Sequence, residues 1–414
     1  MYYEEVARPP TFHHLAVTFV ALALFGCKRN IYPLTFVGPP AGDSSVAPDS
    51  SVPIGDCPDP GAPVGFATMS YLGGEPDGST DAAPWDGGGV GPLGAGSTVL
   101  VDATESDALS QFSTYAGDKT PGPLTILVRG MITIPPPTDG GSADDQKIRV
   151  SSNKTVIGLN VAAGPSGSGF LGGGLVMTKV SNVTLRNLMI QMPNSDDSSD
   201  NVDAIHIEGS TQIWVDHCDL SSSGNTDAGA SYDDLIGITD KSDFVTVSWT
   251  HYHDHRDTGI VGRSENVSAE ADDVDKEHIT FDHDYFQGVA SGPRLRFGTM
   301  HVLNCFFDTV ENYGVAAIDG ATVRVEASAF RNVTVMASSP DYGPVTTYLS
   351  GALSEGYVDL VNSPVAAPNG KNNLTTATVP FTLPYPYKPD LVSSVPAVVM
   401  SCAATGVIAT PAPP

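Results

Sequence analysis

Short runs of β-branched and apolar residues recur along most of the chain, and this recurrence is the feature that most limits the possible folds. Seven runs stand at residues 155–157, 183–185, 213–215, 245–247, 279–281, 300–302 and 323–325. The last three recur at roughly 21 to 23 residues and the earlier ones at up to about 34, which is typical of solenoids. Each run alternates apolar and other residues, as in strands with one face inward. The sequence therefore predicts an all-β parallel β-helix.

A β-sandwich is the structural alternative, because it also consists of many short strands. Sandwich strands recur at shorter intervals and are joined by hairpin turns, whereas here an Asp-Gly pair separates successive runs only once, at residues 319–320. Stacked parallel coils with a continuous core fit the pattern better. Asn187, Asn304 and Asn332 follow apolar pairs. They are compatible with a stacked asparagine ladder and with ordinary turn residues, and both interpretations stay open.

The first residues resemble an export signal. An apolar run at residues 15–25 is too short to anchor the chain across a bilayer. It ends in Leu-Phe-Gly-Cys at residues 24–27, which is similar to the lipobox of bacterial lipoproteins. We therefore expect residues 1–27 to be a lipoprotein-type signal that ends at Cys27, with the lipid on that cysteine and the protein at the cell surface or outer membrane. Plain secretion is the alternative.

Composition separates a tether from a folded domain. Residues 28–60 are rich in Pro, Ser and Asp and are predicted to be a disordered tether, whereas residues 61–414 are predicted to be one β-helix domain. Cys57 and Cys402 bracket that domain, and export permits them to pair. Cys218 and Cys305 fall inside strands, so we expect two buried thiols.

The chain is strongly acidic, with a formal net charge of −27. Such a charge argues against nucleic acid or an anionic membrane surface as the main partner. Contact with a membrane is therefore expected only through the lipid on Cys27. Nothing in the pattern indicates a coiled coil or a flat apolar helix, so a monomer is predicted.

A series of short motifs runs from about residue 65 to at least residue 332. They read VSSNKTVIG at 150–158, SNVTLRNL at 181–188, DAI at 203–205, IWVDHC at 213–218, DFVTVS at 243–248, PRLRFG at 293–298 and HVLN at 301–304. Each motif is weak alone, but their common order and spacing are specific. The series resembles the pectate lyases of polysaccharide lyase family 1. The resemblance implies a right-handed parallel β-helix that cleaves polygalacturonate, an acidic plant-type polysaccharide, by β-elimination.

This resemblance also implies a mechanism. A base must remove the weakly acidic C5 proton of a uronate, and the negative charge that develops on the uronate must be stabilised. The family uses Ca²⁺, bridging protein and substrate carboxylates, for the second task. Its base is an arginine, which is demanding because arginine gives up its proton only at very high pH.

The family's Ca²⁺ ligands carry over only in part. Asp203 matches one acidic ligand, while Asn201 stands at the preceding one as an uncharged oxygen donor. On the next coil Asp233 matches an acidic ligand, but Gly237 takes the place of another and supplies no side chain. The resemblance therefore implies a Ca²⁺ site at Asn201, Asp203 and Asp233 with weakened affinity.

The family's cationic positions are altered further. Asp257 stands where the family has a lysine, although Arg256 is adjacent. Ser291 stands where the family has its catalytic arginine, and the arginine that grips the substrate carboxylate is kept as Arg296. The residues of this motif that form the fold are thus kept, whereas the arginine that acts as the base is replaced.

Two functional hypotheses follow from these changes. In the first, the protein is a lyase with a rearranged site, in which Arg294 or Arg263 supplies the base. In the second, it is a non-catalytic surface protein that binds uronate polymers through Arg256 and Arg296. For Arg294 the structural alternative is an ordinary surface ion pair.

Other residues that look chemically active have simpler interpretations. Asp216 and His217 are chiefly structural in the family, and we expect the same here. His251, His253 and His255 alternate in sequence and are compatible with a transition-metal site. No fourth ligand is evident, so solvated or packing roles are preferred. A polygalacturonase-type hydrolase needs paired carboxylates, but its Gly-His-Gly segment is absent from the sequence.

Overall fold

The computed structural model describes the part of the chain that forms the folded domain. The described residues are 34–36, 57–71, 96–117, 122–136, 146–160, 167–192, 202–222, 234–262, 273, 276–333, 345–348, 356–364 and 382–414. All of them belong to the compact unit Tyr32–Pro414. The predicted signal with Cys27 lies outside the described residues, as does the predicted tether apart from 34–36 and 57–60.

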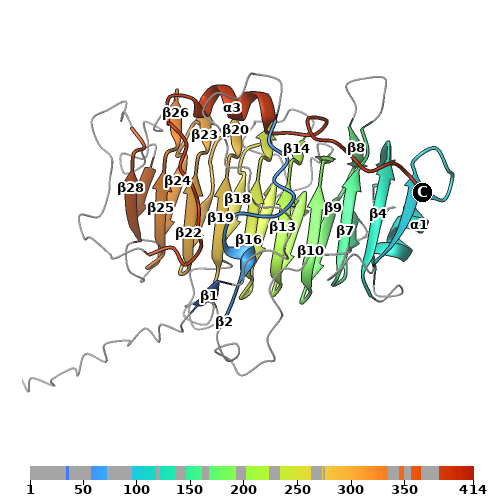
Figure 1. Cartoon of the computed structure of the whole chain (residues 1–414). Helices are drawn as coiled ribbons and strands as arrows, with labels where there is room; N and C mark the ends of the chain where they lie inside the picture. The colour runs from blue at the N-terminus through green and yellow to red at the C-terminus, as the bar shows by residue number, and fades with distance from the viewer. Residues whose placement is uncertain are drawn as a thin grey trace, which may run out of the picture. The chain divides into compact units, whose positions relative to one another are not determined.

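Three parallel sheets dominate the described residues (Figure 1). The first sheet contains β3 (Ser97–Asp102), β4 (Leu124–Arg129), β7 (Lys154–Gly158), β10 (Ser181–Arg186), β13 (Thr211–Asp216), β16 (Asp243–Ser248), β19 (His278–Asp282), β22 (Thr299–Leu303), β25 (Thr322–Glu326) and β28 (Tyr357–Val361). The second contains β5 (Met131–Thr133), β8 (Ser168–Leu171), β11 (Leu188–Met192), β14 (Asp219–Ser222), β17 (His251–His253), β20 (Tyr285–Gln287), β23 (Phe306–Asp308) and β26 (Ala329–Arg331). The third contains β6 (Lys147–Arg149), β9 (Gly174–Thr178), β12 (Ile205–Glu208), β15 (Ile236–Thr239), β18 (Gly259–Val261), β21 (Arg294–Arg296), β24 (Val315–Ile318) and β27 (Val345–Tyr348).

Each full coil adds one strand to the first sheet, then one to the second and one to the third, and the next coil pairs with it in parallel. This is the predicted right-handed parallel β-helix, the hand that parallel crossovers take almost without exception. All seven runs found in the sequence are strands of the first sheet. The strands of the other two sheets escaped prediction because most have only three to five residues, too few for a periodic pattern to emerge.

The core lies between the three sheets and consists of the inward side chains of successive coils. Its aromatic members repeat at one position of the coil: the rings of Tyr252, Phe286, Phe307 and Phe330 stack with centroids 4.6–4.7 Å apart and planes within 6°. The spacing follows from the separation of hydrogen-bonded strands, which is about 4.8 Å. The register of neighbouring coils therefore places like side chains in contact.

The asparagines at the strand ends are turn residues. Asn187, Asn304 and Asn332 have φ values of 55°, 54° and 53°, a region that asparagine tolerates better than most residues. The amide of Asn187 donates to the backbone oxygen of Gly158 at 2.6 Å and to Oδ1 of Asn160, on the preceding coil, at 3.0 Å. All three asparagines thus occupy turns, and Asn187 in addition contacts an asparagine of a neighbouring coil.

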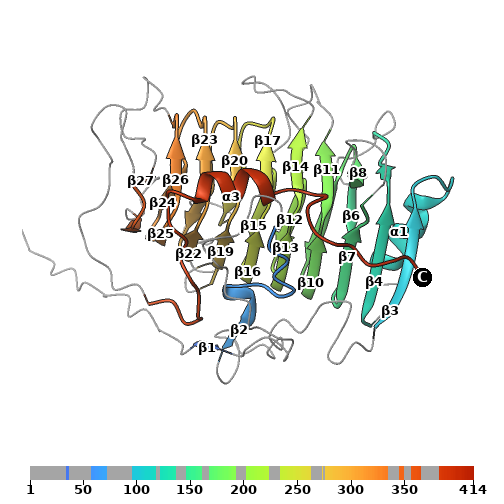
Figure 2. The same cartoon turned by 45° about the horizontal axis from the view of Figure 1, so that its top comes forward.

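Shorter elements lie outside the three sheets. Strand β1 (Leu34–Phe36) pairs antiparallel with β2 (Met69–Tyr71), which directly follows the 3₁₀ helix η1 (Phe66–Thr68). Helix α1 (Ala108–Ala116) precedes β4 and packs Phe112 into the core. Helix α3 (Val395–Cys402) packs against side chains of β20, β23 and β26 of the second sheet (Figures 1 and 2). Among the described residues, both α-helices are far too short to cross a lipid bilayer.

The pairing and burial of the cysteines agree with the sequence, but Cys218 and Cys305 lie between strands, after β13 and β22, rather than inside strands. Cys57 and Cys402 form a disulfide with their Cα atoms 5.2 Å apart. The bond joins the segment before η1 to the end of α3, across a sequence separation of 345 residues. Cys218 and Cys305 are fully buried free thiols, as expected.

The C-terminal segment is attached to the β-helix by an ionic contact at a turn. His283 lies between Asp282 and Asp390, at 2.7 Å and 3.2 Å. Burial by itself lowers the pKa of His283, but the charges of these two carboxylates and their hydrogen bonds raise it to about 9. The protonated ring therefore stabilises the fold fully below the unfolded pKa of about 6.5, and this contribution is lost as pH rises through about 9.

We expect the free energy of unfolding to fall by up to about 3 kcal/mol between pH 6.5 and pH 10 because of this one group. The measurement is thermal or urea unfolding across that pH range. His283→Gln should be less stable than the wild type at pH 6.5 and should lose less stability as the pH rises. Parallel pH profiles for the two proteins would contradict the assignment.

Candidate functional site

The outer face of the third sheet carries the residues that the sequence singled out. His206, Gly237, Ile260, Arg294 and Ala316 occupy one row across neighbouring strands β12, β15, β18, β21 and β24. The residues on either side of them along each strand face the core, so alternation turns this row outward. We call these five residues the outer row.

Asp203 is the described member of the predicted Ca²⁺ site. It lies just before β12, and its Oδ1 accepts a hydrogen bond from the Asp234 backbone N–H at 3.0 Å. Its Oδ2 contacts Nδ1 of His206. Burial lowers the pKa of His206, but the hydrogen bond to Asp203 and that carboxylate's charge raise it above its ordinary value. An ionic pair within the protein thus holds the Asp203 carboxylate.

Gly237 makes room for this pair. A Cβ atom on residue 237 would lie 2.4 Å from Oδ2 of Asp203 and 3.1 Å from Nδ1 of His206. Asn201 and Asp233 lie outside the described residues. Ca²⁺ prefers several oxygen ligands, whereas here an imidazole stands beside the one described carboxylate. The described residues therefore do not fit a Ca²⁺ ion.

Asp257 and Ser291, which stand where the resemblance implies a lysine and an arginine, are neighbours in the structure. They form an isolated parallel bridge next to the third sheet. Arg256 Nε lies 3.3 Å from Asp257 Oδ2, and both side chains are exposed at 44% and 41%. Ser291 is buried, and its hydroxyl oxygen accepts a hydrogen bond from the Asn312 amide at 3.1 Å. Arg256 is thus an exposed cation beside the outer row.

The two arginines of β21 differ in exposure. Arg294 belongs to the outer row and is half-buried, between Ile260 and Ala316 of the neighbouring strands. Arg296 is buried, with its side chain 8% exposed. Its Nη1 donates to the Gly262 carbonyl oxygen at 3.1 Å, and its Nε lies 3.6 Å from Asp319 Oδ2. Arg263, the other suggested base, lies outside the described residues.

Asp216 and His217 lie in the first sheet and at its end, buried away from the outer row. Asp216 accepts hydrogen bonds from Arg186 at 2.8 Å and Ser248 at 2.7 Å, and contacts His217 at 2.8 Å. Burial raises the pKa of Asp216, but the neighbouring His217 and Arg186 hold it below its ordinary value. These contacts support the structural role expected for both residues.

Two residues of these side-chain groups, His206 and Asp219, were not predicted from the sequence. His206 stands three residues after Asp203, but nothing in the sequence shows that it fills the space beside Gly237 of the next coil. Asp219 lies in the second sheet beside His251 and His253, whereas His255 turns to Ser222, 3.1 Å from its hydroxyl oxygen. The residue on the neighbouring coil, such as Gly237 for His206 or His251 for Asp219, is about 30 residues away in the chain, as is usual for solenoids.

The coil architecture and the ionic groups on its outer face define a right-handed parallel β-helix protein with a surface suited to charged ligands. The chain belongs to the pectate lyase family, because the family model described as pectate lyase matches residues 76–406.

Curated relatives agree with this assignment. Pectate lyase plyB of Emericella nidulans is 35% identical over 326 residues, which cover 77% of this chain and 82% of the relative. The pectate trisaccharide-lyase of Bacillus licheniformis is 31% identical over 328 residues, covering 79% of this chain and 86% of the relative.

Solved structures share the fold. A pectate lyase from Bacillus sp. N165, determined in complex with trigalacturonate, aligns with a TM-score of 0.63 and 25% identity and covers 84% of this chain and 99% of its own. A pectate lyase bound to a hexasaccharide aligns with a TM-score of 0.60 at 18% identity, over 83% of this chain and 97% of its own, which supports the fold alone.

The His206–Asp203 pair predicts how a Ca²⁺ site is restored. In the double variant His206→Gly, Gly237→Asp, the imidazole is removed and a second carboxylate enters beside Asp203. We expect this variant to bind Ca²⁺ at least about tenfold more tightly than the wild type, since affinity rises with the number of charged ligands. Isothermal titration with Ca²⁺ measures the difference.

The single variant His206→Gly is the matched control, and it should gain less affinity than the double variant. Equal Ca²⁺ affinity of the wild type and the double variant would show that the pair does not occupy the metal position.

Proposed function

We propose that this protein is a pectate lyase-type polysaccharide lyase that cleaves polygalacturonate-type polymers by β-elimination on the outer face of the third sheet. The observation that carries the proposal is the outer row itself. It places Arg294 on an accessible face, two strands from Gly237 and next to the bridge between Asp257 and Ser291. Membership of the pectate lyase family supports the reaction class.

Arg294 is proposed as the base. Its guanidine would take the C5 proton of a uronate, the C5 electron pair would form the C4–C5 double bond, and the C4–O bond would break. The leaving oxygen would then take a proton from water. Ile260 and Ala316 flank Arg294 on the outer row.

Arg256 and Arg296 are proposed to attract substrate carboxylates. Arg256 is the more accessible of the two, with its side chain 44% exposed. Arg296 lies deeper, so it would act mainly through its charge beneath the surface, partly balanced by Asp319. Any Ca²⁺ held by Asn201, Asp203 and Asp233 would bind weakly, because His206 already pairs with Asp203.

The proposal places this chemistry outside the cytoplasm. The Cys57–Cys402 disulfide supports export, because disulfides persist mainly in oxidising compartments. We propose that residues 1–27 direct export, that Cys27 carries a lipid, and that residues 28–60 connect it to a monomeric domain at 61–414. Because the chain is strongly acidic, it would bind a polyanionic substrate only where cations are exposed locally. The arginines are proposed to supply these cations.

A direct test measures the unsaturated product. Purified protein is mixed with polygalacturonate, with and without added Ca²⁺, and the ultraviolet absorbance of the new double bond is followed. Product is expected, and Arg294→Ala should reduce its rate by about 10²- to 10⁴-fold, the usual contribution of a general base.

Arg149→Ala is the matched control for this test. Arg149 is an exposed arginine on the same face of the third sheet, five strands away from β21, and its loss should leave the rate unchanged. Activity that survives in Arg294→Ala would eliminate Arg294 as the base.

A second candidate function is favoured by Asp257 and Ser291, which leave the family's two cationic positions without a cation. In this alternative the protein binds polygalacturonate without cleaving it. Wild-type protein would then bind the polymer in a pull-down or calorimetric assay and release no unsaturated product. Arg256→Ala should weaken binding severalfold under either candidate, because Arg256 is an exposed cation beside the outer row. Product formation by the wild type would exclude the alternative.

A further inference from the structure

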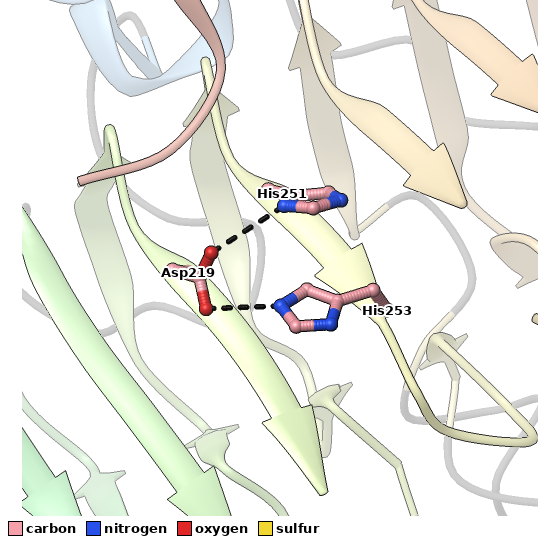
Figure 3. Close-up of side chains that lie close together, drawn as sticks. All are labelled: Asp219, His251 and His253. Carbon is pink, nitrogen blue, oxygen red and sulfur yellow. Dashed lines mark hydrogen bonds and ion pairs between the residues drawn. The ribbon is translucent and has the colours of Figure 1, made fainter. Parts of the chain in front are cut away.

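A cluster of three metal-ligating side chains lies on the outer face of the second sheet, away from the outer row. Asp219 begins β14, and His251 and His253 lie at the two ends of β17, the strand that pairs with β14 in parallel. Leu220 and Tyr252, which lie next to them along these strands, are fully buried in the core. Alternation therefore turns all three side chains outward, toward one another (Figure 3).

The carboxylate of Asp219 contacts both rings through different oxygens. Its Oδ2 lies 3.4 Å from Nδ1 of His251, and its Oδ1 lies 3.1 Å from Nε2 of His253. One ligand atom from each of the three residues lies within 4.8 Å of the others. Each oxygen of the carboxylate thus faces one ring nitrogen.

Each ring has a second partner on its far nitrogen. His253 Nδ1 lies 2.8 Å from Asp254 Oδ2, and His251 Nε2 lies 3.0 Å from Gln287 Oε1. Acceptors in these places keep a proton on the far nitrogen of each ring and leave the nitrogen that faces Asp219 as a lone pair. Histidines that bind metals are held in this way by outer hydrogen bonds.

This arrangement requires positive charge in the centre of the cluster. A neutral imidazole carries one N–H, so His253 cannot donate to both Asp219 and Asp254 at once. The ring nitrogen of His253 that carries no proton would then present its lone pair to a carboxylate. A second proton on the ring removes the conflict, and so does a metal ion between His253, His251 and Asp219.

The distances match a tetrahedral ion. Ligand bonds of about 2.0–2.1 Å to Zn²⁺ place neighbouring ligand atoms about 3.3 Å apart in a tetrahedron, and the two contacts, which involve different oxygens of Asp219, are 3.1 Å and 3.4 Å. We propose that Asp219, His251 and His253 form a binding site for a divalent transition-metal ion of the Zn²⁺ type. Three protein ligands leave one position for water or another small ligand, as in open zinc sites.

The surroundings favour this class of ion and allow it to enter. Imidazole nitrogen suits zinc, copper and nickel, whereas calcium and magnesium prefer oxygen ligands. The side chains of Asp219, His251 and His253 are 13%, 16% and 24% exposed, so solvent reaches the cluster. The bound ion would join β14 to β17 and thereby tie two successive coils together. The site is independent of the proposed lyase reaction.

The test uses the full chain, prepared without an oligohistidine tag and freed of metal with EDTA. Isothermal titration with Zn²⁺ should show one ion per chain that Ca²⁺ does not displace, and Zn²⁺ should raise the melting temperature. Asp219→Asn and His253→Gln should each weaken Zn²⁺ binding at least about tenfold, since even outer partners of a metal ligand contribute that much. Co²⁺ bound to the wild type should show visible absorption that His253→Gln reduces.

His206→Gln is the matched control, because it removes a histidine paired with a single aspartate elsewhere on the molecule, and its Zn²⁺ affinity should equal that of the wild type. Absence of saturable Zn²⁺ binding to the wild type would overturn the proposal, as would unchanged binding in His253→Gln. If Asp219→Asn does not fold, the more exposed His253 decides the question, with circular dichroism confirming that His253→Gln is folded.

Discussion

Backbone hydrogen bonds between successive coils hold each strand in register with its neighbours, and the other features of this molecule depend on that register. Residues at the same position of neighbouring coils come to lie about 4.8 Å apart, whatever their separation in the chain. Inside the helix the register produces the aromatic stack from Tyr252 to Phe330. Outside it aligns His206 with Gly237 and Asp219 with His251.

Because of this register, side chains of one coil fill the space beside a small residue of the next coil. Gly237 has no side chain, and the space beside it is taken by the ionic pair of Asp203 and His206. An internal cation thereby neutralises a carboxylate that the sequence predicted to be a Ca²⁺ ligand. Protein–protein pairing of this kind stabilises the coil locally, because a carboxylate as buried as Asp203 is costly without a partner.

The fold and the site have changed to different extents relative to the family. The motifs that build the coils are kept, since they form the strands, the core and the turns. Asp257 and Ser291 form an isolated bridge between neighbouring coils beside the outer row, at positions where the resemblance implies a lysine and an arginine. Family membership therefore establishes the scaffold, whereas the reaction depends on the particular side chains that the scaffold presents.

The sequence by itself determined the coil architecture, because alternation within seven runs and their spacing report directly on strands that stack in parallel. It also indicated the buried thiols of Cys218 and Cys305, which the structure confirms. Only the tertiary structure decided which side chains meet. The contacts of His206 with Asp203 and Gly237, the burial of Arg296 against Asp319, and the grouping of Asp219 with His251 and His253 depend on the register and the inward or outward direction of each residue. Loop lengths differ from coil to coil, so linear spacing cannot supply that register.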